Sequence, residues 1–102
     1  MHVIQIFLPV RDNNDQSFPG ENYTRIRQAL ATQFGGLTAY TRAPAEGLWK
    51  DEQNAARHDD IVIFEVMAAE LDEQWWQEYK QELVNMFSQD DIIIRVQNVL
   101  LL

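Results

Sequence analysis

The side chains that can do chemistry are few and scattered along this sequence. Six residues carry groups suited to holding a ligand: Tyr40, Arg42, Trp49, His58, Glu65 and Arg95. His58 precedes two aspartates, and a histidine beside carboxylates can act as a general base or contribute to a metal site. Adjacent residues seldom reach one ion, and the other histidine is His2 at the far end of the chain. We therefore expect no metal site, and no residue is assigned a catalytic role.

Several reaction classes are excluded by what the sequence lacks. It has no cysteine, which excludes disulfides, thiolate catalysis and cysteine-ligated metals. Neither Ser17 nor Ser88 lies in a nucleophile elbow. The Gly35–Gly36 pair follows a predicted helix and lacks the glycine spacing of a phosphate or dinucleotide loop. We therefore expect no cofactor.

The charge balance and the first residues limit the partners. The net charge is −8, from 16 acidic and 8 basic residues, and such a surface repels phosphate backbones and anionic membranes. The opening residues MHVIQIFLPV lack a basic region, and their apolar run is short, which indicates neither a signal peptide nor a membrane span. We expect a cytoplasmic protein that binds neither nucleic acid nor membranes.

Periodicity predicts six elements of secondary structure. Side-chain alternation predicts strands over His2–Val10, Leu37–Arg42, residues 60–67 and residues 92–102, and helical spacing predicts helices over Glu21–Phe34 and Asp72–Ser88. Gly35 suits the end of the first helix, and Asp72 suits the N-cap of the second. No pattern emerges from Ala43 to Asp59, so we expect a long loop of the kind that is often functional. Within it, Trp49 would cover either a ligand or the sheet edge.

The order β-α-β-β-α-β within 102 residues predicts one α+β domain over residues 1–102, a ferredoxin-like plait. Each half needs a right-handed crossover, and the two halves interleave. The result is a four-stranded antiparallel sheet with strand order 4-1-3-2 and both helices on one face.

The sheet face away from the helices is predicted to be apolar. The third and fourth strands carry apolar residues on both sides, so Ile61, Ile63 and Ile93 remain uncovered. A patch of this kind is typical of an interface, and a homodimer with a two-fold axis is the favoured cover. Two alternatives stay open: residues 98–102 (NVLLL) fold back over the sheet, or a different protein covers it.

Polar residues interrupt this face. Alternation and strand order place Gln5 on it between Glu65 and Arg95, and Tyr40 or Arg42 can extend the row onto the second strand. Two interpretations follow. The row is a set of charges that fixes the register of an interface, which we favour, or a polar cluster that orients a small molecule in an apolar cavity.

The stretch FGGLTAYTRAPAEGLW, followed by DDIVIFEVM and a helix with two consecutive tryptophans, resembles a bacterial family of uncharacterised proteins with a ferredoxin-like plait. The resemblance covers most of the chain and implies a fold but no activity. The architecture also resembles dimeric α+β barrel proteins, some of which are cofactor-free oxygenases or isomerases. We expect a homodimeric ligand-binding or protein-interaction domain without catalysis. The alternative is a cofactor-free enzyme that uses Glu65, Arg95, Tyr40 or His58.

Overall fold

The structure, a computed structural model, describes the backbone of residues 1–50 and 56–102 and the side chains of residues 1–41 and 60–102. Six elements follow one another in the chain: β1 (His2–Pro9), α1 (Gly20–Phe34), β2 (Thr38–Lys50), β3 (Ala56–Ala68), α2 (Glu73–Met86) and β4 (Ile94–Asn98). This confirms the element order predicted from periodicity.

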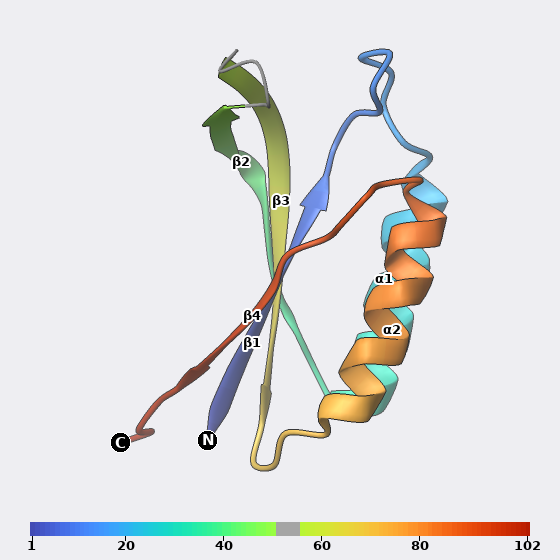
Figure 1. Ribbon diagram of the computed structural model, residues 1–102. Helices are drawn as coiled ribbons and strands as arrows, with labels where there is room; N and C mark the ends of the chain where they lie inside the picture. Colours follow the sequence, from blue (N-terminus) through green and yellow to red (C-terminus); the bar gives the residue numbers. More distant parts are fainter. Residues whose placement is uncertain (51–55) are drawn as a thin grey trace.

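The four strands form one antiparallel sheet with the order β2-β3-β1-β4. This is the predicted order 4-1-3-2 read from the opposite edge. Figure 1 shows both helices on the same side of the sheet. The prediction of an α+β plait with one helical layer is therefore confirmed, and the far face of the sheet carries neither α1 nor α2.

Both predicted helix caps are present. Gly35 ends α1 in the left-handed region with φ 78°, and its N–H donates to the Ala31 carbonyl oxygen at 2.8 Å. Glycine adopts this conformation without a Cβ penalty. At the start of α2, the Trp75 N–H donates to Asp72 Oδ1 at 3.1 Å. Neither of these helices is long and apolar enough to cross a membrane, and that holds for the whole described part of the chain.

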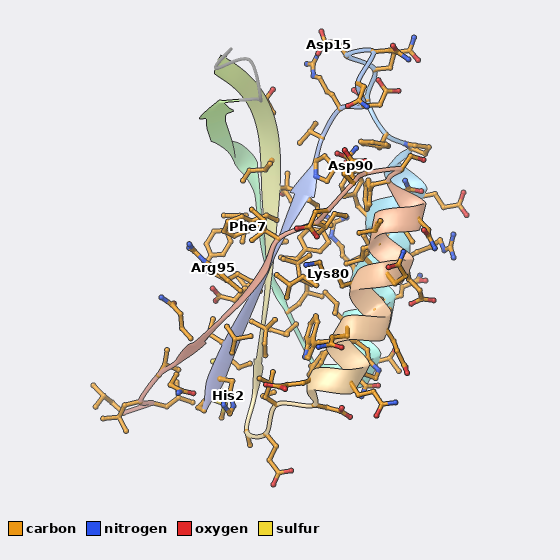
Figure 2. The ribbon with its side chains drawn as sticks, in the orientation of Figure 1. His2, Phe7, Asp15, Lys80, Asp90 and Arg95 are labelled. Atoms are coloured by element: carbon orange, nitrogen blue, oxygen red, sulfur yellow. The ribbon has the colours of Figure 1, made fainter. Side chains whose placement is uncertain are left out.

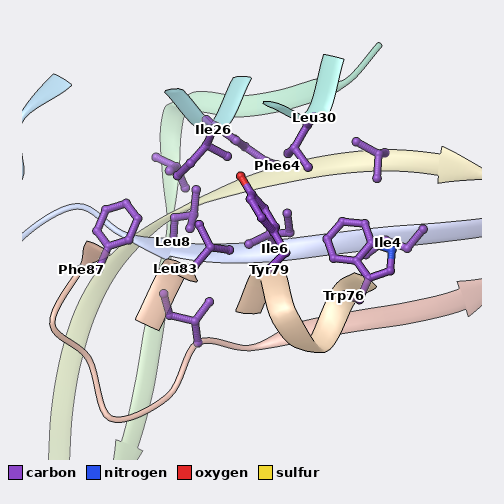
Figure 3. Packing of buried hydrophobic residues seen from close by; sticks show 13 residues of the cluster. Ile4, Ile6, Leu8, Ile26, Leu30, Phe64, Trp76, Tyr79, Leu83 and Phe87 are labelled. Atoms are coloured by element: carbon purple, nitrogen blue, oxygen red, sulfur yellow. The ribbon is translucent and has the colours of Figure 1, made fainter. Parts of the chain in front are cut away.

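The hydrophobic core lies between the helices and the sheet (Figure 3). Because side chains alternate along a strand, each strand presents one apolar set to the helices. The largest side chains that are fully buried in this layer are Phe64, Phe87, Ile4, Ile6, Leu8, Ile26, Leu30 and Leu83. Burying one such side chain contributes about 1.5–3 kcal/mol, so this layer supplies most of the stabilising free energy.

The prediction of a long loop over Ala43–Asp59 is wrong for residues 43–50 and 56–59, and residues 51–55 lie outside the described part of the chain. Strands β2 and β3 continue into this region as a hairpin, with residue pairs from Ala45–Ile61 to Lys50–Ala56. The register of β2 shifts between Tyr40 and Ala45. A strand ladder is held by backbone hydrogen bonds, so it can form in a stretch whose side chains carry no clear alternation.

Strand β4 is shorter than predicted, because it ends at Asn98 instead of Leu102. The Val99 N–H donates to the Met1 carbonyl oxygen at 2.9 Å, which holds one further residue beside β1. Beyond it the chain leaves the sheet. Leu100 is 85% exposed, Leu101 is 55% exposed, and Leu102 is fully exposed. These leucines therefore do not fold back over the sheet, contrary to one of the alternatives considered above.

Candidate functional site

The candidate site lies on the open face, which we define as the sheet face away from α1 and α2. Strand register places residues from all four strands on it in rows. Thr38 pairs with Glu65, Glu65 with Gln5, and Gln5 with Arg95. We call these four residues the polar row. The neighbouring apolar row contains Tyr40, Ile63, Phe7 and Ile93.

Gln5 links the two charges of the polar row. Its Nε2 donates to Glu65 Oε1 at 2.9 Å, and its Oε1 accepts from Arg95 Nε at 2.8 Å. An amide has one donor end and one acceptor end, so the guanidinium and the carboxylate together fix the orientation of Gln5. The predicted position of Gln5 between Glu65 and Arg95 is confirmed.

Arg95 is also held by an aromatic ring. Its guanidinium carbon lies 4.8 Å from the centroid of the Phe7 ring, and Figure 2 shows the two side chains together on the side away from the helices. A cation–π contact at an exposed site contributes about 0.5–1 kcal/mol.

At its Thr38–Glu65 end, the polar row meets a hollow of about 260 Å³. Its walls come from the turn between α1 and β2 and from the end of β3, and the lining residues are Phe34, Gly35, Gly36, Leu37, Thr38, Glu65, Val66 and Met67. A Cβ added at Gly36 would meet no atom within 4 Å, so this wall is backbone that faces open space. The half-buried Glu65 carboxylate thus borders a space that a small molecule can enter.

Tyr40, another residue expected at the site, does not belong to the polar row. Tyr40 pairs with Ile63 and is 48% exposed, so it belongs to the apolar row and does not extend the polar one. Thr38 takes that position instead. Alternation alone did not identify Thr38, because the register of β2 against β3 depends on the shift after Tyr40.

Three predicted site residues lie outside the described side chains: Arg42, Trp49 and His58. For two of them the backbone pairing is known. Trp49 pairs with Arg57, and His58 pairs with Leu48. Whether any of the three reaches a ligand stays a prediction.

A second hollow, of about 450 Å³, lies on the helical layer between α1 and α2. Tyr79 lines it and is 8% exposed. The pKa of Tyr79 is raised to about 12, mainly by burial and to a smaller extent by the nearby Glu82, while Arg25 opposes the change. A phenol with this pKa stays neutral at pH 7, which suits a packing role for Tyr79 better than proton transfer.

Outside these hollows, the described residues offer little for catalysis. Lys80 Nζ lies 2.9 Å from Asp91 Oδ1, and this hydrogen bond is the main reason that the pKa of the Asp91 carboxyl is lowered. The pair joins α2 to the segment before β4. Within the described part of the chain, no three His, Asp or Glu side chains gather as a metal site.

Comparisons with known proteins identify the fold. No model of a protein family matches the sequence, and no curated protein matches it. A solved structure of a phage SAM lyase in complex with S-methyl-5'-thioadenosine superimposes with a TM-score of 0.62 and 16% sequence identity, covering 95% of this chain and 80% of that chain. A phage SAM lyase in the apo state gives a TM-score of 0.58 at 15% identity, covering 94% and 78%. At these identities the likeness is one of fold.

Proposed function

We propose that this chain is a small-ligand-binding domain that works as a homodimer through its open face, with the ligand at the Thr38–Glu65 end of the polar row. The observation that carries the proposal is that Glu65 borders the hollow beside Gly35 and Gly36. One carboxylate oxygen is held by Gln5, so the carboxylate is oriented before a ligand arrives. An oriented polar group in a mainly apolar hollow is the usual composition of a small-molecule site.

The size of the hollow supports a site that a second copy completes. Ligand pockets usually measure about 300–1,000 Å³, and the hollow at Glu65 is slightly smaller, at about 260 Å³. It opens beside Met67, which is 50% exposed. A second copy on the open face would extend its walls and exclude water from the carboxylate.

The exposed apolar side chains of the open face support the homodimer. Tyr40 and Ile93 are 48% and 57% exposed, and both belong to the apolar row. Contiguous apolar surface of this kind marks interaction sites. A second copy is the simplest partner, because a two-fold axis lets one surface cover itself.

The phage SAM lyase with the same fold suggests a ligand class. That protein holds S-methyl-5'-thioadenosine, an adenosine thioether. In this chain Phe34, Leu37 and Met67 offer apolar contacts for a purine or a thioether, while Thr38 and Glu65 offer partners for hydroxyl or cationic groups. We therefore propose an adenosine thioether or the related sulfonium as the ligand.

The alternative is a cofactor-free enzyme acting on the same class of compound. The observation that favours it is that the neighbour is a lyase, and a lyase needs no redox cofactor. Glu65 would then be the group in contact with the reacting atoms. The oxygenase and isomerase activities of the dimeric barrel proteins find less support, since the two solved structures described above are of phage SAM lyase.

Isothermal titration with S-methyl-5'-thioadenosine and with S-adenosylmethionine tests the proposal. We expect the wild-type chain to bind one of them and Glu65→Gln to bind at least tenfold more weakly. Glu70→Gln is the matched control, because Glu70 is exposed and does not line the hollow. Equal affinities of the wild type and Glu65→Gln, or no binding by the wild type at millimolar ligand, would refute the proposal.

The same samples test the enzyme alternative by chromatography. Release of S-methyl-5'-thioadenosine from S-adenosylmethionine by the wild type, and not by Glu65→Gln, would support catalysis. Binding without release would leave the ligand-binding domain as the function.

A further inference from the structure

We infer that two copies pack their open faces with the two-fold axis parallel to β1 and beneath Gln5, so that Glu65 of each copy lies opposite Arg95 of the other. This inference rests on the proposed homodimer and specifies its register. It starts from the charge order of the polar row. Gln5 lies between the two charged residues of the row, Glu65 on β3 and Arg95 on β4, each about 4.8 Å away because neighbouring strands have that spacing.

A face-to-face dimer restricts the direction of the axis. To turn one open face onto another, the two-fold axis must lie in the plane between the two sheets. An axis along the polar row would place Glu65 over Glu65 and Arg95 over Arg95. An axis along β1 reverses the row and places each carboxylate over a guanidinium. Juxtaposed like charges oppose association in an interface, so of these two axes the charges favour the one along β1.

The apolar row agrees with the same axis. Phe7 pairs with Ile63 on β3, and its N–H donates to the Ile93 carbonyl oxygen at 3.0 Å on the other side. The rotation that exchanges Glu65 and Arg95 also places Ile63 of one copy over Ile93 of the other, and Phe7 over Phe7. Polar side chains therefore meet polar ones and apolar side chains meet apolar ones.

Sheet twist is compatible with this register. Packed sheets cross at about 30°, which displaces a residue one strand from the axis by about 2.5 Å along the facing strand. Glu65 and Arg95 have side chains long enough to absorb this shift. Glu65 and Arg95 lie on β3 and β4, the two strands next to β1 and the axis, so their displacement is smaller than that of residues on β2.

The register also affects the ligand site. Because Glu65 borders the hollow, the Arg95 guanidinium of the second copy would lie at the edge of that hollow. Each site would then contain a carboxylate from one copy and a cation from the other. Such a site suits a ligand that carries both a positive and a negative group.

Two charge-reversal variants test the register. In Glu65→Arg alone, every cross-copy contact of the row joins two cations, and in Arg95→Glu alone it joins two anions. In a mixture of the two variants, each such contact joins opposite charges. We expect each single variant to dimerise at least tenfold more weakly than the wild type, and the mixture to dimerise within about threefold of it, measured by sedimentation equilibrium.

Attraction between the net charges of the two variants cannot produce this result, because reversing one charge changes the net charge of −8 by two units and leaves both variants negative. Glu70→Arg is the control for a charge reversal away from the row, and it should dimerise like the wild type. Circular dichroism verifies that each variant is folded.

Single variants that dimerise as tightly as the wild type, or a mixture that fails to dimerise while the wild type does, would overturn the proposed axis. A monomeric wild type at 100 µM would overturn the inference together with the homodimer, and would point to a different protein as the partner of the open face. The ligand titration of the wild type and Glu65→Gln is measured separately, so binding by a monomer would still support the ligand-binding proposal.

Discussion

Gln5 Nε2 lies 2.9 Å from Glu65 Oε1, although the two residues are 60 positions apart in the sequence. The contact crosses from β1 to β3, and Arg95 completes it from β4. Three strands thus share one hydrogen-bonded row on a face that the helices leave uncovered. Four predictions follow from this row and from the elements that position it.

Gln5→Leu should destabilise the chain by about 1–2 kcal/mol, because it removes two hydrogen bonds that each contribute about 1 kcal/mol. Urea unfolding measures the change. Gln97→Leu is the control, since Gln97 lies on the same face of β4 and is exposed. Equal effects of the two substitutions would mean that the row adds no stability.

Gly36→Val should lower the affinity for S-methyl-5'-thioadenosine at least tenfold and leave the fold intact. The new Cβ meets no atom within 4 Å, and the larger side chain then occupies the hollow beside Glu65. Titration calorimetry measures the affinity, and thermal unfolding tests the fold. Gly20→Ala, at the start of α1, should bind like the wild type. Unchanged binding by Gly36→Val would exclude the hollow as the ligand site.

Tyr79 should make the free energy of unfolding fall between pH 10 and pH 12. Its pKa is about 12 in the folded chain against 10.0 for an unperturbed tyrosine. Above pH 10 the unfolded chain therefore loses this proton while the folded chain keeps it. The stabilisation is complete below pH 10 and is lost as the pH rises through 12, by about 1–2 kcal/mol after allowance for solvent screening.

Urea unfolding at pH 9 and pH 11.5 measures the loss, and Tyr79→Phe should reduce it. Tyr40→Phe is the control, because Tyr40 is 48% exposed. If the wild type and Tyr79→Phe lose equal stability over this range, Tyr79 is not the group that titrates.

Asp72→Ala should destabilise the chain by about 1 kcal/mol, the usual cost of removing an N-cap side chain. Asp72 Oδ1 accepts the Trp75 N–H at 3.1 Å, and the substitution leaves that donor at the end of α2 without its partner. Asp90→Ala, at an exposed position, is the matched control in urea unfolding. The assignment fails if both variants unfold at the same urea concentration.

Much of this architecture follows from local patterns. The alternation in β1 separates Ile4 and Ile6 from Gln5, and the order of the elements makes β1 the neighbour of β3 and β4. Those two facts are enough to bring Gln5 between Glu65 and Arg95, because strand side chains repeat every two residues. The helix ends were equally predictable, since Gly35 and Asp72 act through the backbone next to them.

The hairpin beyond Arg42 was not predictable in the same way. Its residues include alanine, proline and glycine, which are not enriched in strands, and the register of β2 against β3 shifts between Tyr40 and Ala45. Thr38 was missed for a related reason. Its place in the polar row depends on how β2 aligns with β3, and alternation within β2 does not determine that alignment.

Strand β2 advances by five residues between its pairs at Tyr40 and Ala45, while β3 advances by two, from Ile63 to Ile61. Strand β2 therefore has more residues than β3 between these two pairs, and the two strands remain paired on both sides of the irregularity. An insertion or deletion here would change only the size of the irregularity. The same change within β1 would turn its buried side chains to the open face. Variation in chain length among evolved or engineered versions of this domain should therefore concentrate between Tyr40 and Ala45.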